Sequence, residues 1–225
     1  MMIRFFDIIF SLISILILLP LLALTSLILK VTGEGEIFYK QERVGKGGRN
    51  FLLYKFATMK KNSSEIGTGT ITIKNDPRVL PIGKILRKTK INELPQLLNI
   101  IKGDMSLIGP RPLTNETFSF YDKDAQNIIK SVKPGLSGIG SIAFSNEENI
   151  LQSEVTSREF YEKIVSKYKA QLEIWFIDNQ STFKYFSLIL LTVIVLLLKN
   201  NKLLWFTFKS LPKPPPELVN QIYNQ

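Results

Sequence analysis

A long uncharged apolar segment near the amino terminus constrains this chain more than any other feature. Residues 8–29 carry no charged side chain, and a helix of about 20 such residues is long enough to cross the hydrocarbon core of a bilayer. Pro20 lies in the middle of the segment, where it removes a backbone donor and is expected to bend the helix. The segment therefore predicts a membrane anchor.

The residues that flank this segment bear on how it sits in the membrane. Asp7 lies in the charged head and no small-x-small cleavage site precedes Lys30, which argues against a secretory signal peptide. Arg4 and Lys30 place basic residues at both ends, which is compatible with a re-entrant helix whose two ends face the cytoplasm. A kinked helix that spans the bilayer fits the same residues, so both topologies stay open.

The composition narrows the chemistry that the chain can perform. Lysine and arginine outnumber aspartate and glutamate by 29 to 19, and the mean hydropathy is +0.10. An anionic partner is therefore expected, either a phosphorylated ligand or an acidic membrane face. The apolar ends and the lack of a recognisable binding motif argue against nucleic acid. The chain has neither cysteine nor histidine, which leaves carboxylates as the main candidates for catalysis and metal binding.

The rest of the chain predicts an α/β fold that is mostly helical with a short β-hairpin. Residues 36–59 have the composition of two strands around a GKGGRN turn. The apolar run at 185–198 spans 14 residues, which is short for a membrane span and favours an interfacial helix. Helices are also expected at 93–102, with an apolar face of Leu94, Leu97, Leu98 and Ile101, and at 116–131 and 151–173; PGLSG at 134–138 is expected to be a turn.

Three parts follow from these patterns. Residues 1–32 are expected to form the membrane anchor, residues 33–174 a cytoplasmic catalytic domain, and residues 175–225 interfacial helices and a tail. Such a chain is a monotopic membrane protein if the anchor is re-entrant, with one domain on the cytoplasmic face.

The residues that can carry chemistry are concentrated in the segment 76–112, DPRVLPIGKILRKTKINELPQLLNIIKGDMSLIGPRP. Basic side chains lead into Asn92 and Glu93, and Asp104 and Arg111 follow. Guanidinium groups near a helix N-terminus suit a pyrophosphate, and a carboxylate there could hold Mg²⁺ or attack phosphorus. The same residue types also fit a capped amphipathic helix with a solvated basic flank, so residue types alone leave both interpretations open.

The order of residues in this segment resembles the signature of the bacterial sugar transferase family, the small monotopic phosphoglycosyl transferases. The likeness is carried by DPRV, GKILRKTKINELPQLLNIIKGDMS and IGPRP, with YKQERVG and YKFATM upstream and KPGLSG downstream. The resemblance implies a re-entrant anchor broken at Pro20. It also implies transfer of a sugar phosphate from a UDP-sugar to undecaprenyl phosphate with release of UMP, the first membrane step of polysaccharide or glycoconjugate synthesis.

The resemblance further implies Mg²⁺ as the cofactor and a location on the cytoplasmic face of the bacterial inner membrane. The expected partners are the UDP-sugar, undecaprenyl phosphate and membrane lipids, with a homodimer as a further candidate. Arg87 and Arg111 match family arginines and are expected to contact the donor phosphates, whereas Glu93 and Asp104 are the candidate metal ligands. Many relatives carry an arginine after the Pro-Gly-x-x-Gly stretch, where this chain has Ser145 and no arginine, so donor contacts from that region are not carried over.

The chain departs from the family pattern at one catalytic position. The family has an Asp-Glu pair whose aspartate is the nucleophile, and the pair here is Asn92-Glu93. Three interpretations follow: Glu93 takes over as nucleophile or metal ligand, the chain binds the donor without turning it over, or the asparagine is an engineered substitution. Asn92 is also a good helix N-cap in each case. A basic membrane-associated scaffold is the alternative from a different functional class.

Overall fold

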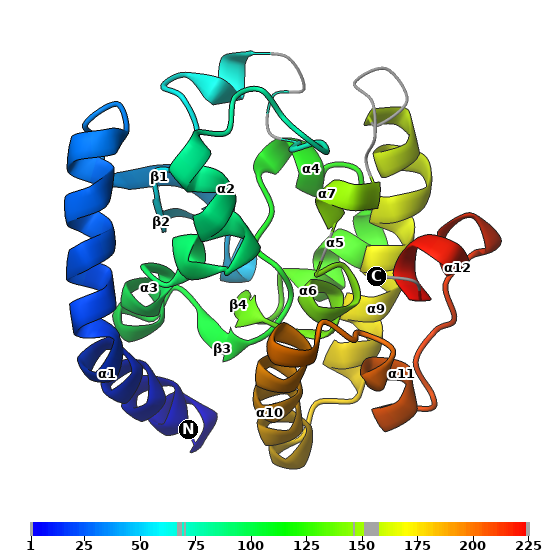
Figure 1. The fold of residues 1–225 in the computed structure, drawn as a ribbon. Helices are drawn as coiled ribbons and strands as arrows, with labels where there is room; N and C mark the ends of the chain where they lie inside the picture. Colours follow the sequence, from blue (N-terminus) through cyan, green and yellow to red (C-terminus); the bar gives the residue numbers. More distant parts are fainter. Residues whose placement is uncertain (1, 67–68, 70, 146, 151–157, 224–225) are drawn as a thin grey trace.

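The apolar amino-terminal segment forms one long helix, α1 (Met2–Thr32), in the computed structural model. The helix continues through Pro20 and changes direction partway along its length (Figure 1), because proline removes a backbone donor and crowds the preceding turn. Among the described residues α1 is the one helix long and apolar enough to cross a membrane, and only 11% of its most apolar window is buried. This exposed apolar surface is compatible with membrane association.

The structure describes residues 2–66, 69, 71–145, 147–150 and 158–223. The helices after α1 are α2 (Pro81–Lys88), α3 (Gln96–Lys102), α4 (Asn115–Phe118), α5 (Lys123–Ile129), α6 (Ile139–Ala143), α7 (Glu147–Ile150), α9 (Ser166–Asp178), α10 (Thr182–Leu198), α11 (Leu203–Thr207) and α12 (Pro216–Tyr223). Short helical turns are η1 (Lys46–Gly48), η2 (Ser63–Glu65), η3 (Ile91–Glu93) and η4 (Tyr161–Val165). The strands are β1 (Phe38–Val44), β2 (Asn50–Phe56), β3 (Ser106–Ile108) and β4 (Gly135–Ser137). The mostly helical class with a small sheet is confirmed.

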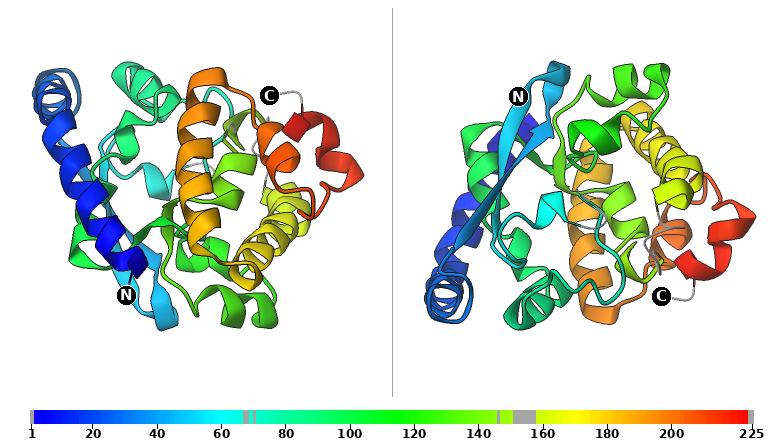
Figure 2. Two further views of the ribbon diagram at one scale, coloured as in Figure 1. Left: turned by 90° about the horizontal axis from the view of Figure 1, so that it is seen from below. Right: turned by 90° about the horizontal axis from the view of Figure 1, so that it is seen from above.

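The predicted hairpin at 36–59 is confirmed. β1 and β2 pair antiparallel, with Phe38 opposite Phe56 and Val44 opposite Asn50. The connecting turn contains Gly47 and Gly48, whose φ angles of 72° and 75° lie in the left-handed region that glycine adopts without strain. The hairpin faces the viewer when the molecule is seen from above (Figure 2).

The prediction of a turn at 134–138 is wrong, because Gly135–Ser137 form strand β4, which pairs in parallel with β3. Glycine makes this pairing possible: a Cβ on Gly135 would lie 2.1 Å from the backbone nitrogen of Gly109. The Gly135 N–H donates to the carbonyl of Pro110 at 2.8 Å. The two glycine-containing motifs therefore meet backbone to backbone, and their contact fixes the Pro-Arg-Pro segment that follows β3.

The predicted helix at 93–102 begins later than expected. α3 starts at Gln96, with Pro95 as its N-cap, and Asn92 lies inside the separate turn η3. The prediction of Asn92 as the helix N-cap is therefore wrong, because Asn92 lies inside η3, whose N-cap is Lys90, and the Asn92 Oδ1 accepts no hydrogen bond. Gly103, with a φ of 98°, caps the carboxyl end of α3.

The buried face of α3 also differs from the predicted one. Leu98 is 44% exposed, whereas Asn99 is fully buried. The Asn99 side chain donates to the carbonyl of Leu52 at 2.8 Å and accepts from the N–H of Tyr54 at 3.0 Å. An asparagine thus occupies the buried face because its side chain pairs with the backbone N–H and C=O groups at the edge of β2. Helical periodicity does not reveal such a contact.

Two further predicted helices need correction. The helix expected at 116–131 is divided into α4 and α5, because Thr114 and Asp122 each begin a new helix by accepting from the N–H groups of Thr117 and Ala125. Of the helix expected at 151–173, residues 151–157 lie outside the described residues, and η4 and α9 occupy the remainder up to 178.

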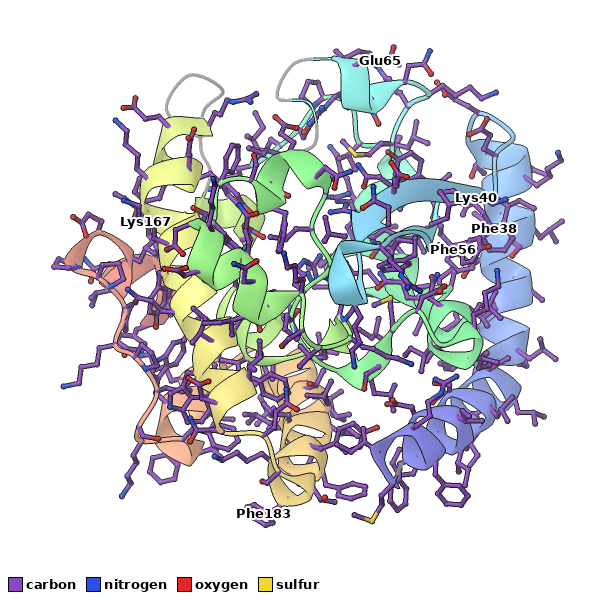
Figure 3. All side chains as sticks on the ribbon, turned by 180° about the vertical axis from the view of Figure 1, so that it is seen from behind. Phe38, Lys40, Phe56, Glu65, Lys167 and Phe183 are labelled. Atoms are coloured by element: carbon purple, nitrogen blue, oxygen red, sulfur yellow. The ribbon has the colours of Figure 1, made fainter. Side chains whose placement is uncertain are left out.

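The second apolar run forms α10, which begins at Thr182 with Ser181 as its N-cap. Tyr185, Leu188 and other residues on one face are buried against α6, α9 and α11 in the main hydrophobic core. The opposite face remains exposed, and Phe183 is 79% exposed. α10 and the first half of α1 lie across the same side of the molecule (Figure 2, left), and Phe183 lies at the edge opposite Glu65 (Figure 3).

The first turns of α1 are tied to the rest of the chain by two charged residues. Arg4 donates to the carbonyls of Ile100 and Ile101 at the carboxyl end of α3. Asp7 is 2% exposed, and its Oδ1 accepts from the Ser106 hydroxyl and the Leu107 N–H, each at 2.9 Å, and from the Tyr185 hydroxyl at 2.8 Å. The anchor is therefore fixed on β3 and α10, while the boundaries near 32 and 174 stay predictions.

Candidate functional site

Glu93 is the carboxylate at the centre of the candidate site. Its side chain is 14% exposed, and its Oε1 accepts a hydrogen bond from Arg111 Nη2 at 2.9 Å. Lys55 Nζ lies 3.5 Å from the same oxygen. Three segments far apart in the sequence meet here: strand β2, the turn η3 and the Pro-Arg-Pro segment after β3.

The ionic state of Glu93 follows from these neighbours. Burial by itself would raise the pKa of Glu93, but the charges of Arg111, Lys55 and Lys90 outweigh it and hold the pKa well below its usual range. Glu93 in turn raises the pKa of Arg111. The pair is thus fully ionised near neutral pH, and Glu93 fixes the position of the guanidinium group.

Lys55 is a site residue that the sequence argument did not single out. Burial, together with the charges of Arg111, Arg43 and Arg87, lowers the pKa of its ammonium group to about 7 against the opposing effect of Glu93. The signal was present in the YKFATM stretch, where a lysine interrupts a strand of apolar and aromatic residues.

Arg43, on β1, is a second residue of the site that was missed. Burial and the nearby charge of Arg111 lower its pKa to about 10, so it remains charged at neutral pH. Its Nη1 donates to the carbonyl of Pro112 at 3.2 Å, and its Nη2 donates to Gln41. Arg43 therefore fixes the Pro-Arg-Pro segment from the side of the hairpin.

The remaining basic residues of the block divide into two groups. Arg87, at the end of α2, and Lys90, before η3, act electrostatically on Lys55 and Glu93, respectively. Lys90 also donates to the carbonyl of Ser145 at 2.9 Å, so the stretch that lacks the family arginine still lies beside the site. Arg78, in contrast, is buried in an ion pair with Asp76 at 2.6 Å and belongs to the scaffold.

Asn92 and Asp104 occupy different surroundings. Asn92 is 5% exposed, and its Oδ1 is shielded from solvent without a hydrogen-bond partner. Asp104 accepts from the Asn99 side chain at 3.1 Å and acts electrostatically on Lys133. Its contacts therefore differ from those of Glu93, and the described residues contain no group of three or more histidine, cysteine or acidic side chains that could hold a metal ion.

A buried carboxylate supports Arg111 from behind. Glu173 on α9 is 3% exposed, and its Oε1 accepts from the Arg111 backbone N–H at 3.2 Å. Burial raises the pKa of Glu173 to about 7. Gly140 leaves the space that this carboxylate needs, since a Cβ there would lie 2.3 Å from Glu173 Oε1. This residue also could not be found from the block at 76–112.

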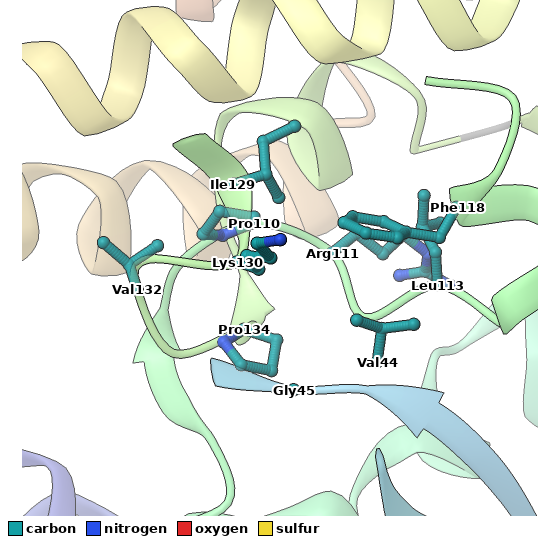
Figure 4. A pocket seen from close by; sticks show the side chains of 10 residues that line it. All are labelled: Val44, Gly45, Pro110, Arg111, Leu113, Phe118, Ile129, Lys130, Val132 and Pro134. Atoms are coloured by element: carbon teal, nitrogen blue, oxygen red, sulfur yellow. The ribbon is translucent and has the colours of Figure 1, made fainter. Parts of the chain in front are cut away.

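A small hollow, lined in part by Arg111, opens between the hairpin, the Pro-Arg-Pro segment and α5 (Figure 4). Its lining includes Val44, Pro110, Phe118 and Lys130, and its volume is about 20 Å³. That is room for about one water molecule. The hollow is too small for a nucleotide or a sugar. The charged side chains around Glu93 are therefore the candidate site for chemistry.

This cationic cluster comprises Arg43, Lys55, Arg87, Lys90 and Arg111. These five basic side chains and Glu93 together carry a formal charge of +4 when Lys55 is protonated, and the carboxylates of Glu147 and Glu173 near Arg111 oppose part of it. Such an excess, on side chains that are already positioned, binds phosphate-bearing anions and stabilises negative charge that develops on them.

Comparison with known proteins agrees with this chemistry. Residues 1–199 match the family described as bacterial sugar transferase, and the chain belongs to that family. It is 35% identical over 158 residues to the exopolysaccharide production protein ExoY of Sinorhizobium fredii, covering 64% of this chain and 70% of that protein. It is 50% identical over 109 residues to a putative undecaprenyl-phosphate N-acetylgalactosaminyl 1-phosphate transferase of Bacillus subtilis, covering 48% of this chain and 60% of that protein.

A longer relative matches over a smaller part of its length. The UDP-N-acetylgalactosamine-undecaprenyl-phosphate N-acetylgalactosaminephosphotransferase of Aeromonas hydrophila is 40% identical over 137 residues, which cover 60% of this chain and 32% of that protein. The chain thus spans 70% of one of these relatives, 60% of the second and about a third of the third. Two of these three relatives are named for transfer to undecaprenyl phosphate.

Proposed function

We propose that this chain transfers a sugar phosphate from a UDP-sugar to undecaprenyl phosphate and releases UMP. The observation that carries this proposal is the cationic cluster around Glu93, which suits a diphosphate donor and a phosphate acceptor. Relatives named for transfer to undecaprenyl phosphate support the acceptor, and one of them is named for a UDP-sugar donor. The product would begin polysaccharide or glycoconjugate synthesis.

The membrane arrangement belongs to the same proposal. α1 enters and leaves the bilayer on the cytoplasmic face of the bacterial inner membrane as a re-entrant helix, and α10 and α11 lie at the interface. The support is the bend of α1 and the exposed apolar side chains on α1, α10 and α11, including Phe183 and Phe206. An interfacial site brings a soluble donor and a lipid acceptor into one geometry. A homodimer stays a prediction.

Each charged residue has a role in this proposal. Arg111, Arg87, Arg43 and Lys55 contact phosphate oxygens, and Glu93 holds Arg111 and Lys55 in position. A single carboxylate fits a Mg²⁺ ion that enters with the donor, because proteins commonly bind Mg²⁺ through one or two carboxylates and substrate phosphates. Glu93 would hold this ion, which when bound offsets negative charge on the diphosphate. Asp104 stays a prediction as a second ligand.

A second candidate function is a catalytically silent relative that binds the donor or a partner transferase. Asn92 favours it, because the amide is neutral, is not nucleophilic, and has its oxygen shielded from solvent. The cationic cluster would bind a UDP-sugar equally in both cases, so donor binding does not separate the two functions whereas turnover does.

Release of UMP tests the proposed function. The purified protein in detergent is incubated with UDP-N-acetylgalactosamine and a panel of other UDP-sugars, Mg²⁺ and undecaprenyl phosphate. We expect UMP release with at least one donor, and a loss of at least about tenfold in Glu93→Gln, because the neutral amide no longer holds Arg111 and Lys55 as strongly. No release from any donor in the wild type, with release gained in Asn92→Asp, would establish the silent alternative.

The pKa of Lys55 predicts how donor binding depends on pH. Lys55 is charged below its pKa of about 7 and loses its charge above it, so we expect affinity for UDP-N-acetylgalactosamine to fall as pH rises from 6 to 9. The fall is at most about tenfold per pH unit, the limit for one linked proton. The dissociation constant is measured calorimetrically at each pH. Lys55→Arg keeps its charge throughout, and it should flatten the profile; an equally steep profile in this variant would contradict the assignment to Lys55.

A further inference from the structure

A second group of cations, outside the cluster around Glu93, gathers beside the first turns of α1. Arg4 Nη2 and Lys133 Nζ lie 3.4 Å and 3.7 Å from the position that a Cβ on Gly103 would occupy. Both charges therefore face the small space that this glycine leaves at the carboxyl end of α3. The charge of Lys46, in the hairpin turn, also acts on Lys133. These three residues, from α1, the hairpin turn and the segment before β4, form the anchor cluster.

The anchor cluster carries positive charge that the protein does not balance. Among the described residues, no carboxylate forms an ion pair with Arg4, Lys46 or Lys133. Burial lowers the pKa of Lys133, and the charges of Arg4 and Lys46 lower it more than those of Asp7 and Asp104 raise it. Both carboxylates already accept hydrogen bonds from other side chains. Three cations and two carboxylates leave a formal charge of +1.

The anchor cluster lies where the chain begins its apolar helix. Arg4 comes just before the uncharged residues 8–29, and its guanidinium is held by the carbonyls at the carboxyl end of α3, where a helix dipole favours a cation. Met2 and Phe5, on the same turns of α1, are 57% and 60% exposed. Cations thus stand next to unburied apolar side chains, on the side of the molecule that α1 shares with α10 (Figure 2, left). An anion that also carries acyl chains would contact both.

We propose that the anchor cluster binds the head-group phosphate of an anionic phospholipid such as phosphatidylglycerol, with the acyl chains along the first turns of α1. This proposal rests on the membrane arrangement proposed above, in which these turns enter the cytoplasmic leaflet. Basic residues at that surface are attracted to anionic lipids. The phosphodiester of phosphatidylglycerol has one negative charge, which balances the cluster, whereas the head group of phosphatidylcholine is neutral overall. The bound lipid holds Arg4, and with it the start of α1, at the membrane surface.

Thermal unfolding of the full chain in dodecyl maltoside tests the lipid site. The protein is titrated with phosphatidylglycerol, with phosphatidylcholine of the same acyl chains, or with inorganic phosphate. We expect phosphatidylglycerol to raise the unfolding midpoint, because a ligand of the folded state stabilises it, and the other two to leave it nearly unchanged. The double variant Lys46→Ala/Lys133→Ala should need at least about tenfold more phosphatidylglycerol for half of the shift, since each basic group near an anionic surface contributes about fivefold.

Two further variants separate the anchor cluster from general charge and from misfolding. Lys123→Ala/Lys167→Ala removes the same charge from exposed positions on α5 and α9, and Lys167 lies on the opposite side of the molecule from α1 (Figure 3). This control should bind phosphatidylglycerol as the wild type does. Lys46→Ala alone changes only an exposed turn residue, so it tests the site even if the double variant does not fold, with an expected loss of about fivefold.

Three results would overturn the lipid site. They are an equal response of the wild type to phosphatidylcholine, an equal response to inorganic phosphate, and an equal loss of affinity in the cluster variant and its control. Release of UMP is measured on the same proteins. We expect the cluster variant to keep the wild-type rate and KM for undecaprenyl phosphate; a KM raised as much as the phosphatidylglycerol affinity falls would make the cluster part of the acceptor site instead. Wild type that binds phosphatidylglycerol but releases no UMP contradicts only the proposed function, so the two failures are distinguishable.

Discussion

Arg111→Ala is expected to lower the rate of UMP release by about 10² to 10³-fold, the range found when one positioned donor to a developing negative charge is removed. Arg111 donates to Glu93 at 2.9 Å, and its own backbone N–H donates to Glu173. The carbonyl of the neighbouring Pro110 accepts from Gly135 in β4, which holds this segment in place. Its loss removes a guanidinium from the phosphates and leaves Glu93 with the charges of Lys55 and Lys90. Initial rates with saturating donor and acceptor measure the effect.

Two variants bound this interpretation. Arg158→Ala removes another ion-paired arginine, but Arg158 pairs with Glu116 on an exposed surface, so its activity should stay within about twofold of wild type. Arg111→Lys keeps the charge without the planar fork and should fall between the two. If the Arg111→Ala enzyme retained full activity, Arg111 would not be a phosphate-contacting residue of the site.

Asp7→Ala is expected to lower the free energy of unfolding by about 3 kcal/mol or more, because hydrogen bonds to a charged group contribute about 1.5 to 3 kcal/mol each. The buried carboxylate accepts from Ser106, Leu107 and Tyr185. Its removal leaves buried donors of β3 and α10 without their acceptor and releases the first turns of α1. Thermal unfolding in one detergent should show a midpoint lower by about 6 to 12 °C.

Tyr185→Phe provides the matched control for the Asp7 cluster. It removes one of the three donors and keeps the aromatic ring, so we expect a loss of about 1.5 kcal/mol, less than in Asp7→Ala, and the anchor still in place. An Asp7→Ala protein as stable as wild type would show that α1 is not fixed on the body through this carboxylate.

The apolar segment shows which features can be predicted from the local sequence pattern. Hydropathy alone predicted a helix over 8–29 and a bend at Pro20, because both depend on nearby residues. The hairpin was equally predictable from strand residues around a glycine-rich turn. The start of α3 and its buried face were not predictable, because residues 91–93 form the separate turn η3 and Asn99 is buried by its contact with β2.

The sequence by itself determined that this chain has an apolar anchor, a basic surplus, neither thiols nor imidazoles, and a motif block in which Glu93 and Arg111 could be named. Only the tertiary structure decided that Lys55 and Arg43 from the hairpin surround the same carboxylate, that Glu173 supports Arg111, and that Asp104 lies with Asn99. The physical reason is that charges act through space: a lysine in a strand acquires a lowered pKa only where folding buries it beside other cations.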